Sequence, residues 1–187
     1  MSTMMRGPHV IARGITLNRP FSAKFEERTE SRWLDWIRPQ TAKGEYLRDR
    51  NGRIRQDYAM SVLLGRPARF GYLVDPTRGV CTVMDHGRRT YFQVSFRAPT
   101  VEGVEGTPSG AELREIEGME CYRVPLSGTY PGQWPEEIWF CPELNHVVFE
   151  RSVAGPQYLW RLFDVRHGDP DEEMFQPPRT YLLRSPR

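Results

Sequence analysis

The chain has 187 residues, which is enough for one well-buried core but leaves two domains marginal. Hydrophobic residues make up 39%, and no apolar run approaches the roughly 18 residues that a membrane-spanning helix needs. The net charge of +2 is too small to predict nucleic-acid binding. We therefore expect a single domain over residues 1–187, peripheral to a membrane at most and without a nucleic-acid partner.

The basic residues of this chain are almost all arginines. Lys24 and Lys43 are the lysines among 26 basic residues, so the remaining 24 are arginines. Arginine carries a planar fork that binds carboxylates and phosphates. The arginines alternate with Asp and Glu, however, which favours ordinary solvated sheet faces. A base composition that favours arginine codons explains the same bias.

The first half of the chain predicts strands joined by tight turns. Residues 1–18 are interpreted as an N-terminal arm, which lacks the apolar stretch of a secretory signal. Phe21, Ala23 and Phe25 then alternate with polar residues, as in a half-buried strand. Asn51-Gly52 is the strongest hairpin signal, because both residue types tolerate positive φ. The strands predicted around and after it cover residues 44–48, 53–59, 69–74, 80–84 and 89–96.

The second half continues this pattern after a predicted exposed loop at 98–110, which is rich in Pro, Gly, Thr and Glu. Helix is limited to one turn at 31–37 and one at 169–175. The further predicted strands cover residues 111–116, 119–126, 136–140, 146–152, 157–165 and 181–183. The sequence therefore predicts a mainly β protein, with a single curved antiparallel sheet of about eight to eleven strands and one or two short helical turns.

The cysteines allow an inference about strand register. If residues 119–126 and 136–140 pair as a hairpin symmetric about Pro131, Cys121 lies opposite Cys141. Directly opposed residues at a non-hydrogen-bonded position come close enough for a disulfide. That bond would indicate an oxidising compartment and leave Cys81 as a free thiol. The alternative is two buried thiols that act as small hydrophobic residues.

Motifs for catalysis or metal binding are weak. The sequence contains no Cys-x-x-Cys, its four histidines are scattered, and it has no phosphate-binding or nucleophile-elbow glycine pattern. Asp85-His86 resembles a base with its orienting carboxylate, but a turn ending in Gly87 is the favoured interpretation. The acidic stretch 167–173 lacks the ligand spacing of a calcium loop. We therefore expect no enzymatic activity, no cofactor and no metal.

The candidate binding residues are Trp33 and Trp36, flanked by Arg32 and Arg38. Trp and Arg are enriched at interaction hot spots, and Trp is also enriched at membrane interfaces. The segment is therefore predicted to dock a protein or a bilayer, or else its indoles cap the open end of the protein's own core. The other three tryptophans, Trp134, Trp139 and Trp160, lie in or beside predicted strands and are predicted to be core residues, because Trp139 and Trp160 fall within apolar runs.

Several motifs occur in an order that resembles a family. Residues 44–57 are similar to the "yRD-x-x-GR-x-R-x-E" hairpin of small exported proteins common in acidobacteria. Residues 74–85 resemble their "I-x-D-P-x-x-G-x-x-y-x-L-D" strand pair. Residues 139–175 resemble their "W-y-s-P-E-L … R-L-x-x-I-x-x-G-E-P-D-x-x-L-F" ending. These proteins are distantly similar to the LolA/LolB/RseB-like half-barrels, in which a curved antiparallel sheet surrounds a hydrophobic groove.

The resemblance implies an extracytoplasmic, non-catalytic binding module, periplasmic in bacteria, that holds a lipid, an acyl chain or an apolar partner segment. The second hypothesis is an extrinsic accessory subunit that docks on an envelope protein or membrane complex through a surface patch. An apolar cavity would favour the first hypothesis, and a filled core with exposed tryptophans would favour the second. A cytoplasmic location stays open because residues 1–18 show no signal.

Overall fold

The computed structural model describes residues 19–30, 40–60, 67–96, 109–124, 137–152 and 157–185, which form one 12-stranded sheet and a short 3-10 helix, η2 (Glu172–Phe175). The strands are β1 (Phe21–Glu30), β2 (Gln40–Arg48), β3 (Ile54–Met60), β4 (Ala68–Asp75), β5 (Val80–Asp85), β6 (Thr90–Ser95), β7 (Leu113–Ile116), β8 (Met119–Arg123), β9 (Glu137–Cys141), β10 (His146–Ser152), β11 (Gln157–His167) and β12 (Leu182–Leu183).

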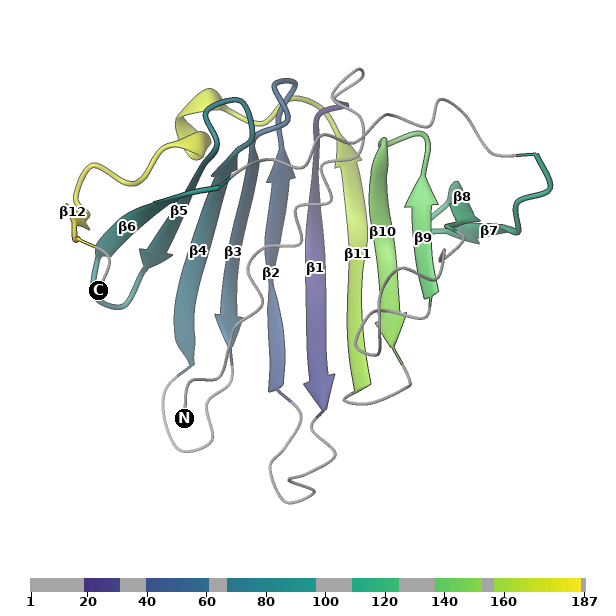
Figure 1. Cartoon of the computed structure of the whole chain (residues 1–187), viewed down its shortest axis with the longest axis horizontal. Helices are drawn as coiled ribbons and strands as arrows, with labels where there is room; N and C mark the ends of the chain where they lie inside the picture. The colour runs from purple at the N-terminus through teal and green to yellow at the C-terminus, as the bar shows by residue number, and fades with distance from the viewer. Residues whose placement is uncertain are drawn as a thin grey trace.

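The sheet consists of two meanders that meet at its centre (Figure 1). Strands β1 to β6 pair in sequence order, and so do β7 to β11. The two series are joined where β1 pairs with β11, from Phe21 opposite His167 to Glu30 opposite Gln157. Every strand pair is antiparallel except the last, in which β12 runs parallel to β6.

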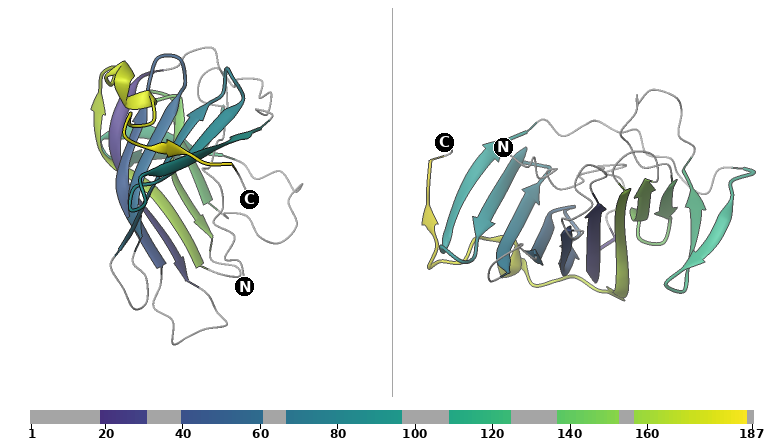
Figure 2. Two further views of the ribbon diagram at one scale, coloured as in Figure 1. Left: turned by 90° about the vertical axis from the view of Figure 1, so that its left-hand side faces the viewer. Right: turned by 90° about the horizontal axis from the view of Figure 1, so that it is seen from below.

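The sheet is strongly curved, so it has a concave and a convex face (Figure 2). Side chains alternate between the two faces along each strand. On β1, Phe21, Ala23 and Phe25 point to the concave face and are buried, whereas Lys24 on the opposite face is exposed. The main hydrophobic cluster includes these three residues together with Tyr46, Trp160 and Leu162 from neighbouring strands.

The centre of the sheet depends on a close approach at Gly44. This residue lies on β2 between Phe25 of β1 and Tyr58 of β3. Because glycine has no side chain, the two rings meet across it, with centroids 6.1 Å apart and an edge-on angle of 74°. A Cβ atom at position 44 would lie 1.8 Å from the backbone oxygen of Asp57. Gly44 therefore permits both the ring contact and the tight pairing of β2 with β3.

The predicted architecture is confirmed: the described structure is mainly β, with one curved open sheet. The hairpin at Asn51-Gly52 forms, with Gly52 at φ 76°. The helical turn predicted at 169–175 appears as η2, while the turn predicted at 31–37 and most of the loop at 98–110 lie outside the described residues. Two details were wrong, because the described sheet has twelve strands and its parallel β12 makes it mixed.

The substitution Gly44→Ala should lower the free energy of unfolding by about 3 kcal/mol, because the added methyl group meets backbone atoms that cannot rotate away. Urea denaturation would measure the loss. Gly87→Ala is the matched control, since a Cβ there meets just one side-chain oxygen of Asp85, at 3.3 Å, and should change stability by about 0.5 kcal/mol. Equal losses in the two variants would contradict the packing role of Gly44.

Candidate functional site

The chain after β11 forms a strap, defined here as residues 168–185, that crosses the convex face of the sheet (Figure 2). It leaves the sheet at Gly168, contains η2, and ends by adding β12 to the edge of β6. Four apolar side chains of the convex face and the strap are buried but lie outside the main cluster: Leu47, Leu73, Met84 and Phe175. The strap thus gives the convex face a small core of its own.

The β2–β3 hairpin holds the first half of the strap through its arginines. All three contacts join positions 119 residues apart, with guanidinium groups as donors and strap oxygens as acceptors. They are Arg50 to the Asp169 carboxylate, Arg53 to Glu172 at 3.4 Å, and Arg55 to the Met174 backbone oxygen at 2.6 Å. The Arg53 guanidinium also lies over the Phe175 ring, 5.1 Å from its centroid. The two ion pairs each have one well-exposed partner and are individually weak, so the strap depends on their combination with the Arg55 hydrogen bond and the buried Phe175 ring.

The second half of the strap is fixed by His86. Its Nδ1 lies 2.8 Å from the Tyr181 hydroxyl, and its Nε2 lies 2.9 Å from Oδ1 of Asp57. Arg55 donates to the other oxygen of the same carboxylate. A Cβ at Gly71 would lie 2.4 Å from Asp57 Oδ1 and 2.8 Å from His86 Nε2. Glycine at position 71 therefore leaves the room in which the Asp57–His86 contact forms.

The hydrogen-bond roles follow from this geometry. If Nε2–H donates to the Asp57 carboxylate, Nδ1 accepts from the Tyr181 hydroxyl, which is the order of donors found in acid–base triads. Here the phenol belongs to the strap, so the chain of contacts anchors the strap to β3 and to the β5–β6 turn. Asp85 does not take the orienting role, because its Oδ1 accepts from the backbone N–H of Arg88 at 2.9 Å. The turn interpretation of residues 85–87 is therefore confirmed.

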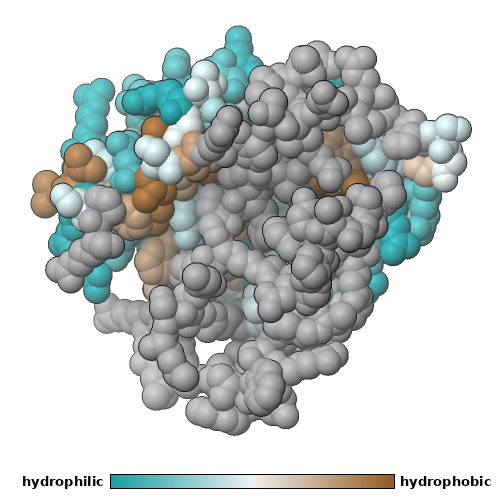
Figure 3. All heavy atoms as spheres, viewed as in Figure 1, coloured by the Kyte–Doolittle hydropathy of each residue, from teal (hydrophilic) through white to brown (hydrophobic). Residues whose placement is uncertain are grey.

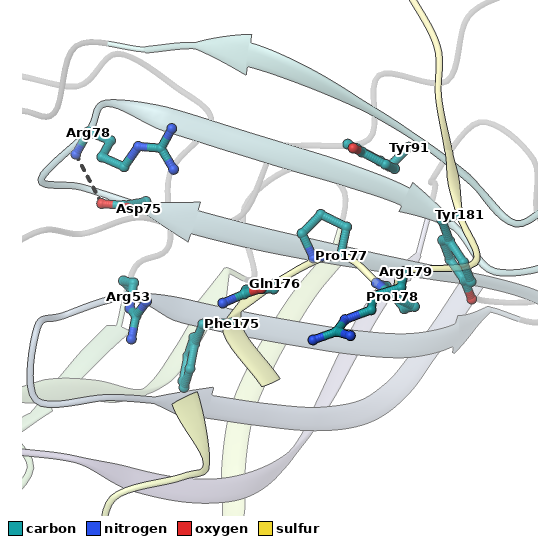
Figure 4. Close-up of a pocket in the computed structure, with 10 residues that line it drawn as sticks. All are labelled: Arg53, Asp75, Arg78, Tyr91, Phe175, Gln176, Pro177, Pro178, Arg179 and Tyr181. Carbon is teal, nitrogen blue, oxygen red and sulfur yellow. Dashed lines mark hydrogen bonds between the residues drawn. The ribbon is translucent and has the colours of Figure 1, made fainter. Parts of the chain in front are cut away.

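Between the strap and the sheet lies a pocket of about 390 Å³, with an adjoining cavity of about 100 Å³ (Figure 4). Its walls are formed mainly by aromatic rings, prolines and arginines from the strap, β6 and two turns. The lining residues are Arg53, Asp75, Arg78, Tyr91, Phe175, Gln176, Pro177, Pro178, Arg179 and Tyr181. The rings and prolines therefore give the pocket an apolar part, and the guanidinium groups of its three arginines give it a cationic part.

Two of the arginines that line the pocket have no ion-pair partner among the described residues. Arg53 is paired with Asp49 at 2.6 Å and with Glu172. Arg78 and Arg179 have no ion-pair partner within the part of the chain that the structure describes. Their side chains extend toward the middle of the lining set in Figure 4. The Asp75 carboxylate nearby is engaged by the backbone N–H of Arg78 at 2.9 Å. The pocket lining therefore includes two guanidinium groups, on opposite sides of the lining set, that no ion pair among the described residues engages.

A second polar cluster lies inside the main core. The Tyr46 hydroxyl and His146 Nε2 are 2.9 Å apart, and Arg48 donates to the backbone oxygen of Asn145 at 2.9 Å. The Trp160 ring packs edge-on against Tyr46. Burial, aided by the Arg48 charge, lowers the pKa of His146 well below its usual 6.5, so its ring stays neutral and accepts from Tyr46. This cluster is closed to solvent and serves packing.

The structure describes some of the residues that the sequence singled out, and others lie outside the described part of the chain. Trp33, Trp36, Arg32 and Arg38 lie outside the described residues, so their docking role stays a prediction. Two of the three predicted core tryptophans are confirmed, with Trp139 and Trp160 exposed by 2% and 5%, and Trp134 lies outside the described residues. Tyr122 of β8 pairs with Phe140 of β9, and extending this register by one residue places Cys121 opposite Cys141, both as free thiols.

The pocket itself was not predicted from the sequence. Residues 177–181 read Pro-Pro-Arg-Thr-Tyr, and of these only Tyr181 was assigned to an element, the predicted closing strand 181–183. Prolines beside an arginine and a tyrosine are a signal for a binding surface, but their partners come from turns about 100 residues earlier. Among the described residues, no helix is long and apolar enough to cross a membrane, and no group of three His, Cys, Asp or Glu side chains could hold a metal ion.

Removing the Tyr181 hydroxyl should loosen the end of the strap. Tyr181→Phe loses one hydrogen bond, worth about 1 kcal/mol or about fivefold in local opening. Hydrogen exchange should therefore accelerate at the amides of Leu182 and Arg184, which donate to backbone oxygens of the β6 strand and its turn. Tyr91→Phe is the control, because the Tyr91 hydroxyl has no hydrogen-bond partner within the described residues. Equal acceleration in both variants would contradict the anchoring role of Tyr181.

The buried histidine should make stability depend on pH. Below pH 6.5 His146 is protonated in the unfolded chain but stays neutral in the folded chain, because its folded pKa is lower. The free energy of unfolding must therefore fall as the pH falls. The slope should approach about 1.4 kcal/mol per pH unit until the folded pKa is reached. Urea midpoints at pH 7, 6 and 5 would measure it. The urea midpoint of His146→Gln should lack the part of the pH dependence that His146 causes. The same pH dependence in the variant and the parent would contradict the prediction.

No protein-family model and no curated protein matches this sequence. The resemblance to LolA/LolB/RseB-like half-barrels therefore rests on the sequence motifs alone.

Proposed function

We propose that this protein is a non-catalytic binding module, and that the strap pocket holds a small anionic ligand with an apolar part. The observation that carries the proposal is the pair of available guanidinium groups, Arg78 and Arg179, in a pocket walled by aromatic rings and prolines. Guanidinium groups bind carboxylates and phosphates through paired, charge-assisted hydrogen bonds. At about 390 Å³ the pocket lies within the usual range for small ligands.

The chemistry of the pocket favours binding over catalysis. Arginine remains protonated in proteins, so neither Arg78 nor Arg179 can serve as a general base or a nucleophile. Of the two phenols that line the pocket, Tyr181 has its hydroxyl engaged by His86 in the anchor of the strap. The pocket is therefore suited to recognise charge and shape.

The family resemblance implies a lipid, an acyl chain or an apolar segment as the ligand, and this pocket fits such a ligand better when it also carries an anionic group. A bare acyl chain or apolar segment would leave Arg78 and Arg179 without a partner. An amphiphile, in which an acyl or alkyl chain carries a carboxylate or a phosphate, would engage both the guanidinium groups and the rings. The proposed extracytoplasmic, periplasmic location is supported by the same sequence motifs and by the facing cysteines.

The alternative proposal is an extrinsic subunit docked on an envelope protein or membrane complex. It is favoured by the edge of the sheet at β12, where Leu182 and Leu183 are exposed by 71% and 63%. Hydrophobic side chains gather at the side of the molecule where β6 and β12 lie (Figure 3). Exposed apolar residues on an edge strand are typical of an interaction surface.

Calorimetric titration can test the binding proposal with one amphiphile and its two halves. Hexyl phosphate and hexanoate should bind, whereas inorganic phosphate and hexanol should each bind more weakly because each lacks one half of the interaction. Replacing Arg78 or Arg179 with Ala should weaken hexyl phosphate binding about tenfold, which corresponds to the loss of one charged hydrogen bond.

Arg166→Ala is the matched control, because Arg166 is exposed on β11 and pairs with Asp164 at 3.6 Å, outside the pocket. Its affinity should equal that of the parent. Binding that is unchanged in the Arg78 and Arg179 variants, or absent in the parent for every probe, would refute the pocket assignment. In that case the exposed β12 edge becomes the better candidate site.

A further inference from the structure

Strands β8 and β9 place two cysteines directly opposite each other. Tyr122 pairs with Phe140 and Arg123 with Trp139. Continuing the same antiparallel register by one residue pairs Cys121 with Cys141, and both residues belong to their strands. The pair lies near the end of the sheet, because only the four-residue β7 follows β8 in the described strand order.

The hydrogen-bond pattern determines how close the two backbones are. The Val124 N–H donates to the backbone oxygen of Ile138 at 2.9 Å, which marks a hydrogen-bonded pair. Such pairs alternate with non-hydrogen-bonded pairs along an antiparallel ladder. Three residues further on, Cys121 and Cys141 therefore occupy a non-hydrogen-bonded position, where Cα atoms are typically about 4.5 Å apart. This separation lies within the range that disulfides span.

A second contact supports this assignment. The Arg123 N–H donates to the backbone oxygen of Glu112, on the β7 side, at 2.9 Å. Residues two apart on a strand direct their amides to the same side, so the Cys121 amide also points to β7 and away from β9. Two independent hydrogen bonds, from Val124 and from Arg123, therefore indicate that the Cys121 backbone makes no hydrogen bond to β9.

Both cysteines belong to the main hydrophobic cluster and contact Met119. Cys121 and Cys141 are fully buried. The Cys141 thiol lies 3.7 Å from the Met119 sulfur. The Cys121 thiol donates to the Met119 backbone oxygen at 3.5 Å. The interaction with the neighbouring Cys121 thiol, against the effect of burial, lowers the pKa of Cys141 to about 7. Cys81, by contrast, lies on β5 in the other meander, and burial raises its pKa to about 11.

We propose that Cys121 and Cys141 are a redox-active pair that closes into a disulfide between β8 and β9 when a disulfide oxidant is present. The inference is independent of the strap pocket. Access to the buried sulfurs comes from local opening of the short edge strand β7, in which Leu113, Arg114 and Glu115 are exposed.

The chemistry is thiol–disulfide exchange with a small oxidised disulfide such as oxidised glutathione. The Cys141 thiolate attacks one sulfur of the oxidant, which forms a mixed disulfide and releases one thiolate. The Cys121 thiolate then attacks the Cys141 sulfur and expels the second. The two cysteines lose two protons and two electrons, and the oxidant becomes two thiols.

The test uses the full chain incubated with excess oxidised glutathione, then denatured and alkylated with N-ethylmaleimide. Intact mass should show one alkylated cysteine, and peptide mapping should identify it as Cys81 and find Cys121 linked to Cys141. The oxidised protein should melt about 5–10 °C higher than the reduced protein, since the bond closes a loop of about 20 residues.

Variants separate the pair from a general effect of oxidation. Cys121→Ala and Cys141→Ala should show no melting shift and no intramolecular link, whereas Cys81→Ala should retain both. Mapping of the parent protein provides the decisive result even if a variant fails to fold. Three alkylated cysteines, a link that involves Cys81, or glutathione retained on Cys121 or Cys141 would each overturn the proposal.

Discussion

The pairing of β1 with β11 is the contact on which the rest of the structure depends. Each meander can form from neighbouring hairpins, but neither alone builds the central sheet. Their union joins residues about 130 to 146 positions apart, from Glu30 opposite Gln157 to Phe21 opposite His167. It also brings Trp160 against Tyr46 and Leu162 opposite Phe25, so the main core contains side chains from both halves. Closing so long a loop is entropically costly, and the aromatic core offsets that cost.

The position of the strap follows from the same pairing. Phe21 lies opposite Arg48 on one side and His167 on the other. The last residues of β11 therefore lie at the same end of the strands as the β2–β3 hairpin. The chain that continues at Gly168 therefore meets the arginines of that hairpin at once, beginning with Arg50. From there it covers the convex face and reaches β6. Because the hairpin arginines are used to hold the strap, the two available cations of the pocket come from elsewhere, in the β4–β5 turn and in the strap itself.

Local sequence rules determined much of the fold. Alternating apolar residues on β1, the Asn51-Gly52 turn and the acidic turn before Phe175 each predicted the element that forms. The register of β8 and β9 was also predictable, since a symmetric hairpin needs just its turn position to place Cys121 opposite Cys141. These features depend on residues near one another in the chain, where turn geometry and side-chain periodicity are sufficient.

The tertiary structure alone decided the order of the two meanders, the parallel β12 and the pocket. Asp57, His86 and Tyr181 come from three segments, and no spacing in the sequence indicates that they meet. The same holds for Arg78 and Arg179, which share a pocket because β11 returns beside β1. Side-chain patterns show which face of a strand is buried. They do not show which distant strand will cover it, because that choice depends on the packing of the whole sheet.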